Sequence, residues 1–245
     1  MPINNTEKNA YAAGPGRNAR ETAYRIIRDK IIGCELKPGE AISDKQLAEE
    51  LQMSRTPVRE ALIILSTSNM VVLKPQTGTF VSPIDVHRMD TEQFARYALE
   101  KEIITRACGR LTEEHRWLYE ENLRTYQHYA QLPGENRGKN LLRLDNEFHR
   151  IAFLAVGREE NYRIQFDQLQ HIERMRMLSL HFMGQETNVK DHTELYHAIA
   201  DGDLKTTLAR LEVHLGRYRE NLSAVQERYP DYFSMNCEKR KNIFN

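Results

Sequence analysis

The chain has 245 residues, with 35 basic and 35 acidic side chains and no formal net charge. A chain of this length can bury a sizeable core, in one large domain or two modest ones. The even balance excludes a protein that coats nucleic acid through overall positive charge, but a local basic patch still permits specific DNA binding.

Residues 1–18 are polar and include Gly14, Pro15 and Gly16 in succession, which predicts a flexible N-terminal arm. From Ala19 to Ile32, apolar residues recur on one helical face. We interpret this segment as the first helix of a small domain that occupies residues 19–82.

A second helix is predicted to begin at Ser43, because Gln46 follows three residues later in the arrangement of a capping box. After a short turn, Thr56 can cap a third helix with Pro57 at its first position, where a missing N–H costs nothing. The apolar residues of this third helix fall on one stripe, and Arg55 and Arg59 lie together on the opposite side. This is the pattern of a DNA recognition helix, whose early residues point guanidinium groups at a groove.

Beyond Asn69, which tolerates the left-handed conformation at a helix end, the sequence predicts a strand, a turn over Pro75–Gly78 and a returning strand. The order of short helix, turn, arginine-bearing helix and glycine-tipped hairpin predicts a winged helix-turn-helix. The alternative is a plain packing unit of three helices with solvated arginines.

The whole run from Leu36 to Val81 resembles the DNA-binding domain of GntR-family transcriptional regulators. The resemblance implies operator contacts from Lys45, Arg55, Arg59 and the wing-tip Gly78, and we include the adjacent Thr56 and Thr77 in the expected interface. It also implies a homodimer that binds double-stranded DNA at a short inverted repeat, most often as a repressor. The usual Glu-Gly-Leu after the recognition helix is replaced here by the residues at 68–70, Ser-Asn-Met.

Helical periodicity begins after Pro83 and continues to about Arg228, without strand-like alternation. The fold class is therefore mainly α, with an all-α antiparallel bundle over residues 86–228 following the winged domain. The predicted helices are Met89–Arg110, Thr112–Gln131, Lys139–Ala155, Glu159–His181, Asn188–Ala200 and Leu204–Gln226.

One aspartate and three histidines lie on the apolar faces of these helices. Asp145 and His149 are one turn apart, and His192 and His214 belong to two later helices. One carboxylate and three imidazoles suit zinc or another first-row divalent ion, with room for a further ligand. From periodicity alone, the alternative is a set of hydrogen-bonded core residues.

The segments FARYALEKEIITRACGRL, LDNEFHRIAF and DHTELYHAIADGDLKTTLARLEVHL resemble the FCD-type effector domain of the FadR-like branch of the same family. This resemblance implies that Asp145, His149, His192 and His214 bind a divalent metal ion, with zinc expected first and nickel or manganese as alternatives. His171, His181 and His197 match no ligand position and are expected at the surface or in the pocket lining.

The resemblance also implies a small carboxylate effector that occupies an open metal position. Arg96 and Glu100 match an Arg-x-x-x-Glu pattern of this branch and are candidate effector-binding residues. Arg174 and Arg176 are weaker candidates, because alternate residues on a helix cannot both face the same way, and of the two we include Arg174 among the expected effector-binding residues. One of these two arginines is expected on a solvated face.

Effector binding is expected to shift the bundle and change the spacing of the two recognition helices in the dimer. Two other functions remain open at this stage. One is a metal-free regulator that binds an acyl thioester, and the other is a metal-dependent hydrolase fused to a DNA-binding module. We expect no enzymatic activity, because no Glu or Asp near the four candidate ligands is an obvious general base and a catalytic bundle would not need a wing.

Residues 229–245 form a polar and aromatic tail whose role the sequence does not indicate. The three cysteines, Cys34, Cys108 and Cys237, are scattered and form no metal-binding pair. Together with the lack of a signal-peptide core or a bilayer-spanning apolar run, they favour a cytoplasmic protein that does not contact a membrane.

Overall fold

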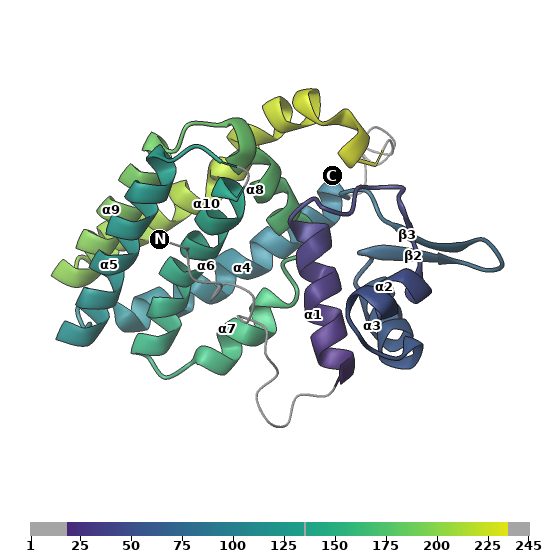
Figure 1. Cartoon of the computed structure of the whole chain (residues 1–245). Helices are drawn as coiled ribbons and strands as arrows, with labels where there is room; N and C mark the ends of the chain where they lie inside the picture. The colour runs from purple at the N-terminus through teal and green to yellow at the C-terminus, as the bar shows by residue number, and fades with distance from the viewer. Residues whose placement is uncertain (1–18, 135, 235–245) are drawn as a thin grey trace, which may run out of the picture. The chain divides into compact units, whose positions relative to one another are not determined.

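The computed structural model describes residues 19–134 and 136–234, which fall into two compact units divided after Ser82 (Figure 1). The predicted N-terminal arm and the tail from residue 235 onward, including Cys237, lie outside the described residues. Each unit is described separately below.

The first unit is a helix-turn-helix with a small sheet. Helix α1 packs on the recognition helix α3, and α2 packs on α3 from another side. Fully buried Ala23 and Ile27 of α1 meet the predicted apolar stripe of α3, which includes Val58, Ala61 and Leu65. The elements are α1 (Ala19–Ile32), β1 (Ala41–Ile42), α2 (Asp44–Glu50), α3 (Arg55–Thr67), β2 (Val71–Lys74) and β3 (Gly78–Val81).

Of the two helix N-caps predicted in this unit, one is confirmed and the other is wrong. Ser43 caps α2 as predicted, since its hydroxyl accepts the backbone N–H of Gln46 at 3.2 Å. The prediction that Thr56 caps α3 was wrong, because α3 begins at Arg55 and its N-cap is Ser54, which makes no side-chain capping bond. The helical conformation therefore extends back to include Arg55 and fixes its backbone.

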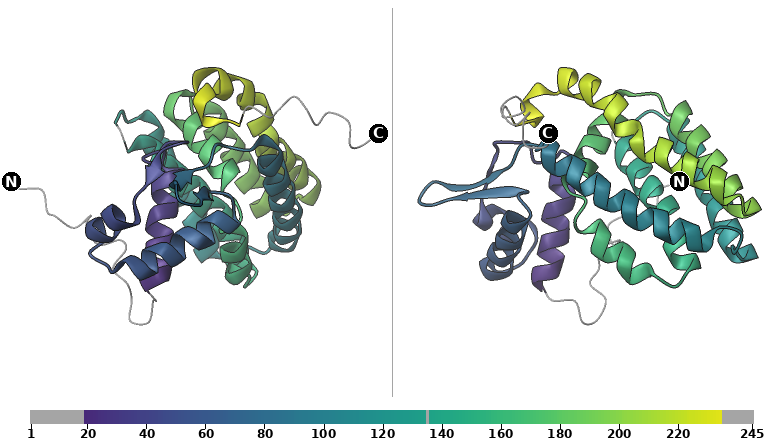
Figure 2. Two further views of the ribbon diagram at one scale, coloured as in Figure 1. Left: turned by 90° about the vertical axis from the view of Figure 1, so that its right-hand side faces the viewer. Right: turned by 180° about the vertical axis from the view of Figure 1, so that it is seen from behind.

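The wing is an antiparallel hairpin of β2 and β3, which extends beyond the helices of its unit (Figure 2). A third strand, β1, was not predicted and pairs with β3, so that the sheet order is β1-β3-β2. Asn69 has a φ of +59°, the left-handed conformation predicted for it after the recognition helix. Asparagine tolerates this conformation better than most residues, which explains why glycine is dispensable there.

The second unit is a helical bundle, as predicted. Helix α6 packs against α4, α5, α7 and α8, and α10 packs against α4, α8 and α9. This arrangement buries Asp145 and His149 of α6 together with the apolar side chains of the same helix, such as Phe148 and Ile151. The elements are α4 (Val86–Ala107), α5 (Glu113–Gln131), α6 (Arg137–Ala155), α7 (Glu159–Phe166), α8 (His171–Phe182), α9 (Glu186–Asp201), α10 (Leu204–Arg228) and the 3₁₀ turn η2 (Pro230–Tyr232).

The single helix predicted over Glu159–His181 is in fact two helices, α7 and α8, interrupted at residues 167–170. No glycine or proline marks this break, so the sequence offered no local signal for it. The interruption has a structural consequence, because it creates a new helix N-terminus at α8. Within the described residues, no helix is both long and apolar enough to cross a membrane.

Candidate metal centre and DNA-binding surface

Four predicted ligands from three helices converge inside the bundle. Nε2 of His214 lies 3.1 Å from Nε2 of His149 and 3.2 Å from Nε2 of His192. The carboxylate of Asp145 lies 3.5 Å from His192 Nε2 and 3.7 Å from His149 Nε2. The four donor atoms lie within 4.8 Å of one another, and all four residues are buried.

This geometry fits a divalent metal ion. Donors at about 2.0–2.1 Å from a tetrahedral zinc ion lie about 3.3–3.4 Å apart, close to the separations found here. The ring nitrogen of His214 carries either one proton or one lone pair, so its contacts with His149 and His192 cannot both be good hydrogen bonds. A metal ion between the three rings accepts all three lone pairs, and three nitrogens with one oxygen suit a first-row divalent ion.

Burial keeps His149 and His192 in the neutral form that a metal requires. It is the main reason that the pKa of His149 is lowered and that the pKa of His192 falls well below its ordinary value. Metal ligation needs the neutral imidazole, so this shift favours ligation near neutral pH.

Glu100 does not line the cavity but contacts Nδ1 of His149, the ring nitrogen that faces away from the other three candidate ligands. Its Oε2 is 2.6 Å from His149 Nδ1, and its Oε1 accepts a 2.6 Å hydrogen bond from Arg96 Nε. Burial alone would raise the pKa of Glu100, but the charge of Arg96 and the contacts with Arg96 and His149 outweigh burial and lower it well below its usual range. A carboxylate at Nδ1 holds the proton there and aims the lone pair of Nε2 at the metal position.

Asp191 plays a similar part beside His214, and the sequence did not single it out. Its Oδ2 lies 3.9 Å from His214 Nδ1 and accepts a 2.7 Å hydrogen bond from Arg217 Nε. Burial opposes ionisation, but the neighbouring His214 and the hydrogen bonds donated by Arg217 lower the pKa of Asp191 below its usual range. Asp191 directly precedes His192, and this adjacency in the sequence could have indicated that Asp191 lies at the candidate site.

The candidate ligand Asp145 also forms an ion pair with an arginine. Arg176 of α8 forms ion pairs with Asp145 and Glu173, and Arg96 Nη2 lies 4.0 Å from Asp145. Burial would raise the pKa of Asp145, but the charge of Arg176 lowers it. The expectation that either Arg174 or Arg176 is solvated was wrong, because both side chains are largely buried.

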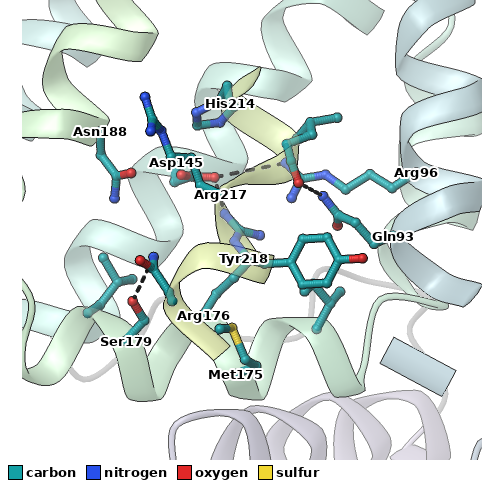
Figure 3. A pocket seen from close by; sticks show the side chains of 14 residues that line it. Gln93, Arg96, Asp145, Met175, Arg176, Ser179, Asn188, His214, Arg217 and Tyr218 are labelled. Carbon is teal, nitrogen blue, oxygen red and sulfur yellow. Dashed lines mark hydrogen bonds and ion pairs between the residues drawn. The ribbon is translucent and has the colours of Figure 1, made fainter. Parts of the chain in front are cut away.

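A cavity of about 60 Å³ opens beside these residues (Figure 3). It is lined by Asp145 and His214 and by three arginines, Arg96, Arg176 and Arg217. Arg174, the predicted effector residue on α8, is not part of this lining, whereas Arg176 is. The lining also includes uncharged polar side chains that the sequence interpretation missed, namely Gln93, Ser179, Asn188, Tyr218 and Asn221. Several of them lie one helical turn from Arg176, His192 or His214, which was the signal available.

Two of the histidines that were not assigned as ligands differ in their environment. His197 is exposed on α9, as expected for a surface residue. His171 is buried, and its Nδ1 accepts the backbone N–H of Asp85 at 3.1 Å. His171 is therefore a structural residue rather than part of a polar surface.

In the first unit, the predicted DNA-binding residues are exposed. Arg55 is the first residue of α3, and Arg59 follows one turn later. Arg59 and the wing residue Gly78 line the same groove of about 340 Å³ between α3 and the sheet. The remaining candidates, Lys45, Thr56 and Thr77, are also exposed. The wing tip requires glycine, because Gly78 has a φ of +128°.

Two family models match the chain. One, described as bacterial regulatory proteins of the gntR family, matches residues 19–81, and the other, the FCD domain, matches residues 93–217. The second match covers about half of the chain, and the two together leave only the termini and a short connection.

Curated relatives align over most of the chain. The HTH-type transcriptional repressor RspR of Escherichia coli K12 is 25% identical over 226 residues, which are 90% of this chain and 96% of RspR. McbR of the same strain is 29% identical over 67% of this chain and 72% of its own.

Solved structures agree on the fold. The structure of E. coli McbR/YncC superimposes with a TM-score of 0.72 at 20% identity and covers 87% of this chain and 99% of that one. A regulator from Rhodococcus sp. RHA1 gives a TM-score of 0.64 at 20% identity, with 84% and 98% coverage.

Proposed function

This chain belongs to the GntR family of bacterial regulatory proteins and carries an FCD domain, and from that premise we propose that a small organic acid controls its binding to an operator. The family is one of DNA-binding transcriptional regulators, so the chain is a regulator and not an enzyme. The observation that carries the proposal is the cavity in which three arginines and two candidate metal ligands meet.

The proposed ligands of the metal ion are Asp145, His149, His192 and His214, with zinc as the first candidate and nickel or manganese as alternatives. A bound ion would supply a Lewis-acidic position that a carboxylate oxygen can occupy. Glu100 contacts Nδ1 of His149 and holds its ring in the orientation that ligation needs, and Asp191 lies 3.9 Å from Nδ1 of His214. Arg176 orients Asp145 through its ion pair.

The charge balance around the cavity favours a ligand with one negative charge. Buried carboxylates at four positions form ion pairs with the three lining arginines, so this set of seven side chains carries one net negative charge. A divalent ion would reverse this to one net positive charge. A small hydroxylated monocarboxylate would neutralise the site and find partners in the uncharged polar lining. The carboxylates are Glu100, Asp145, Glu173 and Asp191.

The size of the cavity favours a small acid over the acyl thioester considered above. About 60 Å³ corresponds to the space of a few small groups, and the lining around it is rich in charged and polar side chains. An acyl chain would instead need a long apolar channel. A hydrolase is disfavoured by the family assignment.

Helix α8 offers a route from the cavity to the segment that joins the two units. Arg176 on α8 contacts Asp145, while His171 at the start of α8 accepts the backbone N–H of Asp85, three residues after Ser82. Glu92 of α4 accepts the N–H groups of His171 and Ile172 at 2.8 and 2.9 Å. A ligand that binds one position of α8 more tightly than another would shift the equilibrium at this junction.

On the DNA side, we propose that a homodimer represses transcription from an inverted repeat, with Arg55 and Arg59 reading base edges and Lys45, Thr56, Thr77 and Gly78 contacting the backbone or groove. Replacing Arg59 by Ala should weaken operator binding by about 1–3 kcal/mol if the guanidinium makes a bidentate base contact. Unchanged affinity in a titration at fixed salt would remove Arg59 from the interface.

A thermal-shift screen tests the effector. The purified protein is screened against sugar acids, other hydroxy monocarboxylates and dicarboxylates, before and after chelation and metal restoration. We expect one or more monocarboxylates to raise the melting temperature and chelation to abolish the effect. A shift that survives chelation would contradict metal-anchored binding, and the absence of any shift would contradict a small-acid effector.

A further inference from the structure

The carboxylate of Asp44 joins the two arginines of the recognition helix. Asp44 is the first residue of α2, and its two oxygens accept hydrogen bonds from Arg55 Nη2 at 2.8 and 3.0 Å. Oδ2 also accepts a hydrogen bond from Arg59 Nε. The Asp44 side chain is 21% exposed, whereas those of Arg55 and Arg59 are 52% and 60% exposed. One half-buried anion thus anchors two exposed cations.

This arrangement answers a physical difficulty of the recognition helix. Arg55 and Arg59 are one turn apart, and two like charges at this spacing repel each other on a helix. Each long side chain also loses rotamer freedom, about 2 kcal/mol, when it is fixed against a base edge. A shared carboxylate reduces the repulsion and restricts both side chains before DNA arrives. Slight burial opposes ionisation of Asp44, but the hydrogen bonds from Arg55 and Arg59 lower its pKa below the usual value.

We propose that Asp44 is a specificity-determining residue, which holds Arg55 and Arg59 in the orientation that reads base edges. The inference rests on the proposed function, since it takes these two arginines as the residues that contact the operator. Asp44 lies with Arg59 and Gly78 in the groove between α3 and the sheet, so the orientation it imposes is that of the groove-facing side of α3.

Asp44 should change the affinity for non-specific DNA and the affinity for the operator in opposite directions. Asp44 repels phosphates, so its charge lowers affinity for any duplex. The preorganised arginines raise affinity for the correct sequence alone, because a bidentate guanine contact depends on geometry whereas a phosphate contact tolerates many side-chain positions. Removing the charge should therefore raise non-specific affinity or leave it unchanged, and lower specific affinity.

The test compares Asp44→Asn with the wild type on two duplexes. One is the consensus that the wild-type protein selects from a random DNA library, and the other is a scrambled duplex of the same composition. We expect the ratio of the two affinities to fall about 5- to 150-fold, the discrimination that one bidentate base contact supplies. Asp44→Glu, which keeps the charge, should restore part of the ratio.

Glu60→Gln is the matched control, because it removes the same charge from an exposed position of the recognition helix itself. This control should leave the ratio unchanged. Melting curves of every variant separate loss of specificity from loss of folding, and a merely structural role for Asp44 would lower both affinities together with the melting temperature.

Arg59→Ala separates the inference from the proposed function. If Arg59→Ala lowers specific binding and Asp44→Asn does not, Asp44 does not position the arginine. If neither substitution changes specific binding, the proposed base contact itself is wrong. If Asp44 acts through Arg59, its substitution should cost less in the Arg59→Ala background than alone. The inference would also be overturned if Asp44→Asn lost sequence preference only at a cytosine position. That result would mean that Asp44 accepts a hydrogen bond directly from the amino group of the base.

Discussion

The metal centre makes a quantitative prediction about stability, which replacement of His192 by Ala tests. His192 is fully buried, and its Nε2 lies 3.2 Å from His214 Nε2, so it supplies one of the four donors. His197 lies on the same helix but is exposed, and His197→Ala is the matched control. The measured quantity is the difference in melting temperature between metal-loaded and chelated protein, taken within each variant.

This difference cancels the packing that His192→Ala loses in the absence of metal, including the stacking of His192 on Phe148 at 4.3 Å. A ligand that binds only the native state at one thousand times its dissociation constant stabilises it by about 4.1 kcal/mol. In a chain of this size, 1 kcal/mol corresponds to about 2–4 °C, so chelation of the wild type should lower the melting temperature by about 8–16 °C.

Loss of one donor should weaken binding at least as much as loss of an outer-shell partner, by about 100-fold. At the same metal concentration about 1.4 kcal/mol then remains, and the chelation effect shrinks to about 3–6 °C. His197→Ala should retain the full effect. Equal effects of chelation on His192→Ala and wild type would refute the assignment of His192 as a ligand, and no effect on the wild type would refute the metal centre.

Three further predictions concern single positions. Glu100→Gln should weaken zinc binding about 10- to 100-fold in a calorimetric titration, because His149 loses the carboxylate at Nδ1, and the exposed Glu102→Gln should not. Gly78→Ala should cost about 1 kcal/mol of unfolding free energy and weaken operator binding, because the φ of +128° is strained for alanine; unchanged denaturant midpoints would contradict this. Burial raises the pKa of Glu92 from 4.5 to about 7, so the native state takes up a proton between these values that the unfolded chain does not, and stability rises as pH falls. Relative to Glu92→Gln, wild-type protein should therefore gain about 3 kcal/mol between pH 8 and pH 4.5, and parallel pH profiles would refute this reasoning.

Helical periodicity identified the four inward-facing candidate ligands, because it reports which side of a helix is buried. Asp145 and His149 lie on one stripe of α6, and His192 and His214 lie on the apolar faces of their own helices. Periodicity cannot tell which buried faces meet across helices. The resemblance to a known family supplied that step, and the structure brings the four donors together.

Helical periodicity failed to predict the position of a side chain where that position depends on a residue of another helix or strand. Arg174 and Arg176 alternate on α8, and only the packing of α8 against α6 determines that Arg176 reaches Asp145. Glu100 matched a family pattern, but its position behind His149 depends on how α4 lies against α6. Strand β1 has two residues and forms only because β3 offers an edge to pair with.

Arginines pair with an aspartate both at the candidate DNA-binding surface and at the cavity. The degree of burial decides whether the arginine stays fixed on that aspartate or can exchange it for another partner. At the cavity, Asp145 and Arg176 are shielded from water, so their mutual attraction is strong and a mobile arginine would leave a buried charge unpaired. At the recognition helix, Arg55 and Arg59 are exposed, so the attraction of Asp44 is weak enough for a DNA phosphate or guanine edge to compete with it. Burial therefore fixes the arginine beside the proposed metal centre, while exposure leaves the two arginines proposed to read DNA oriented and still able to change partners.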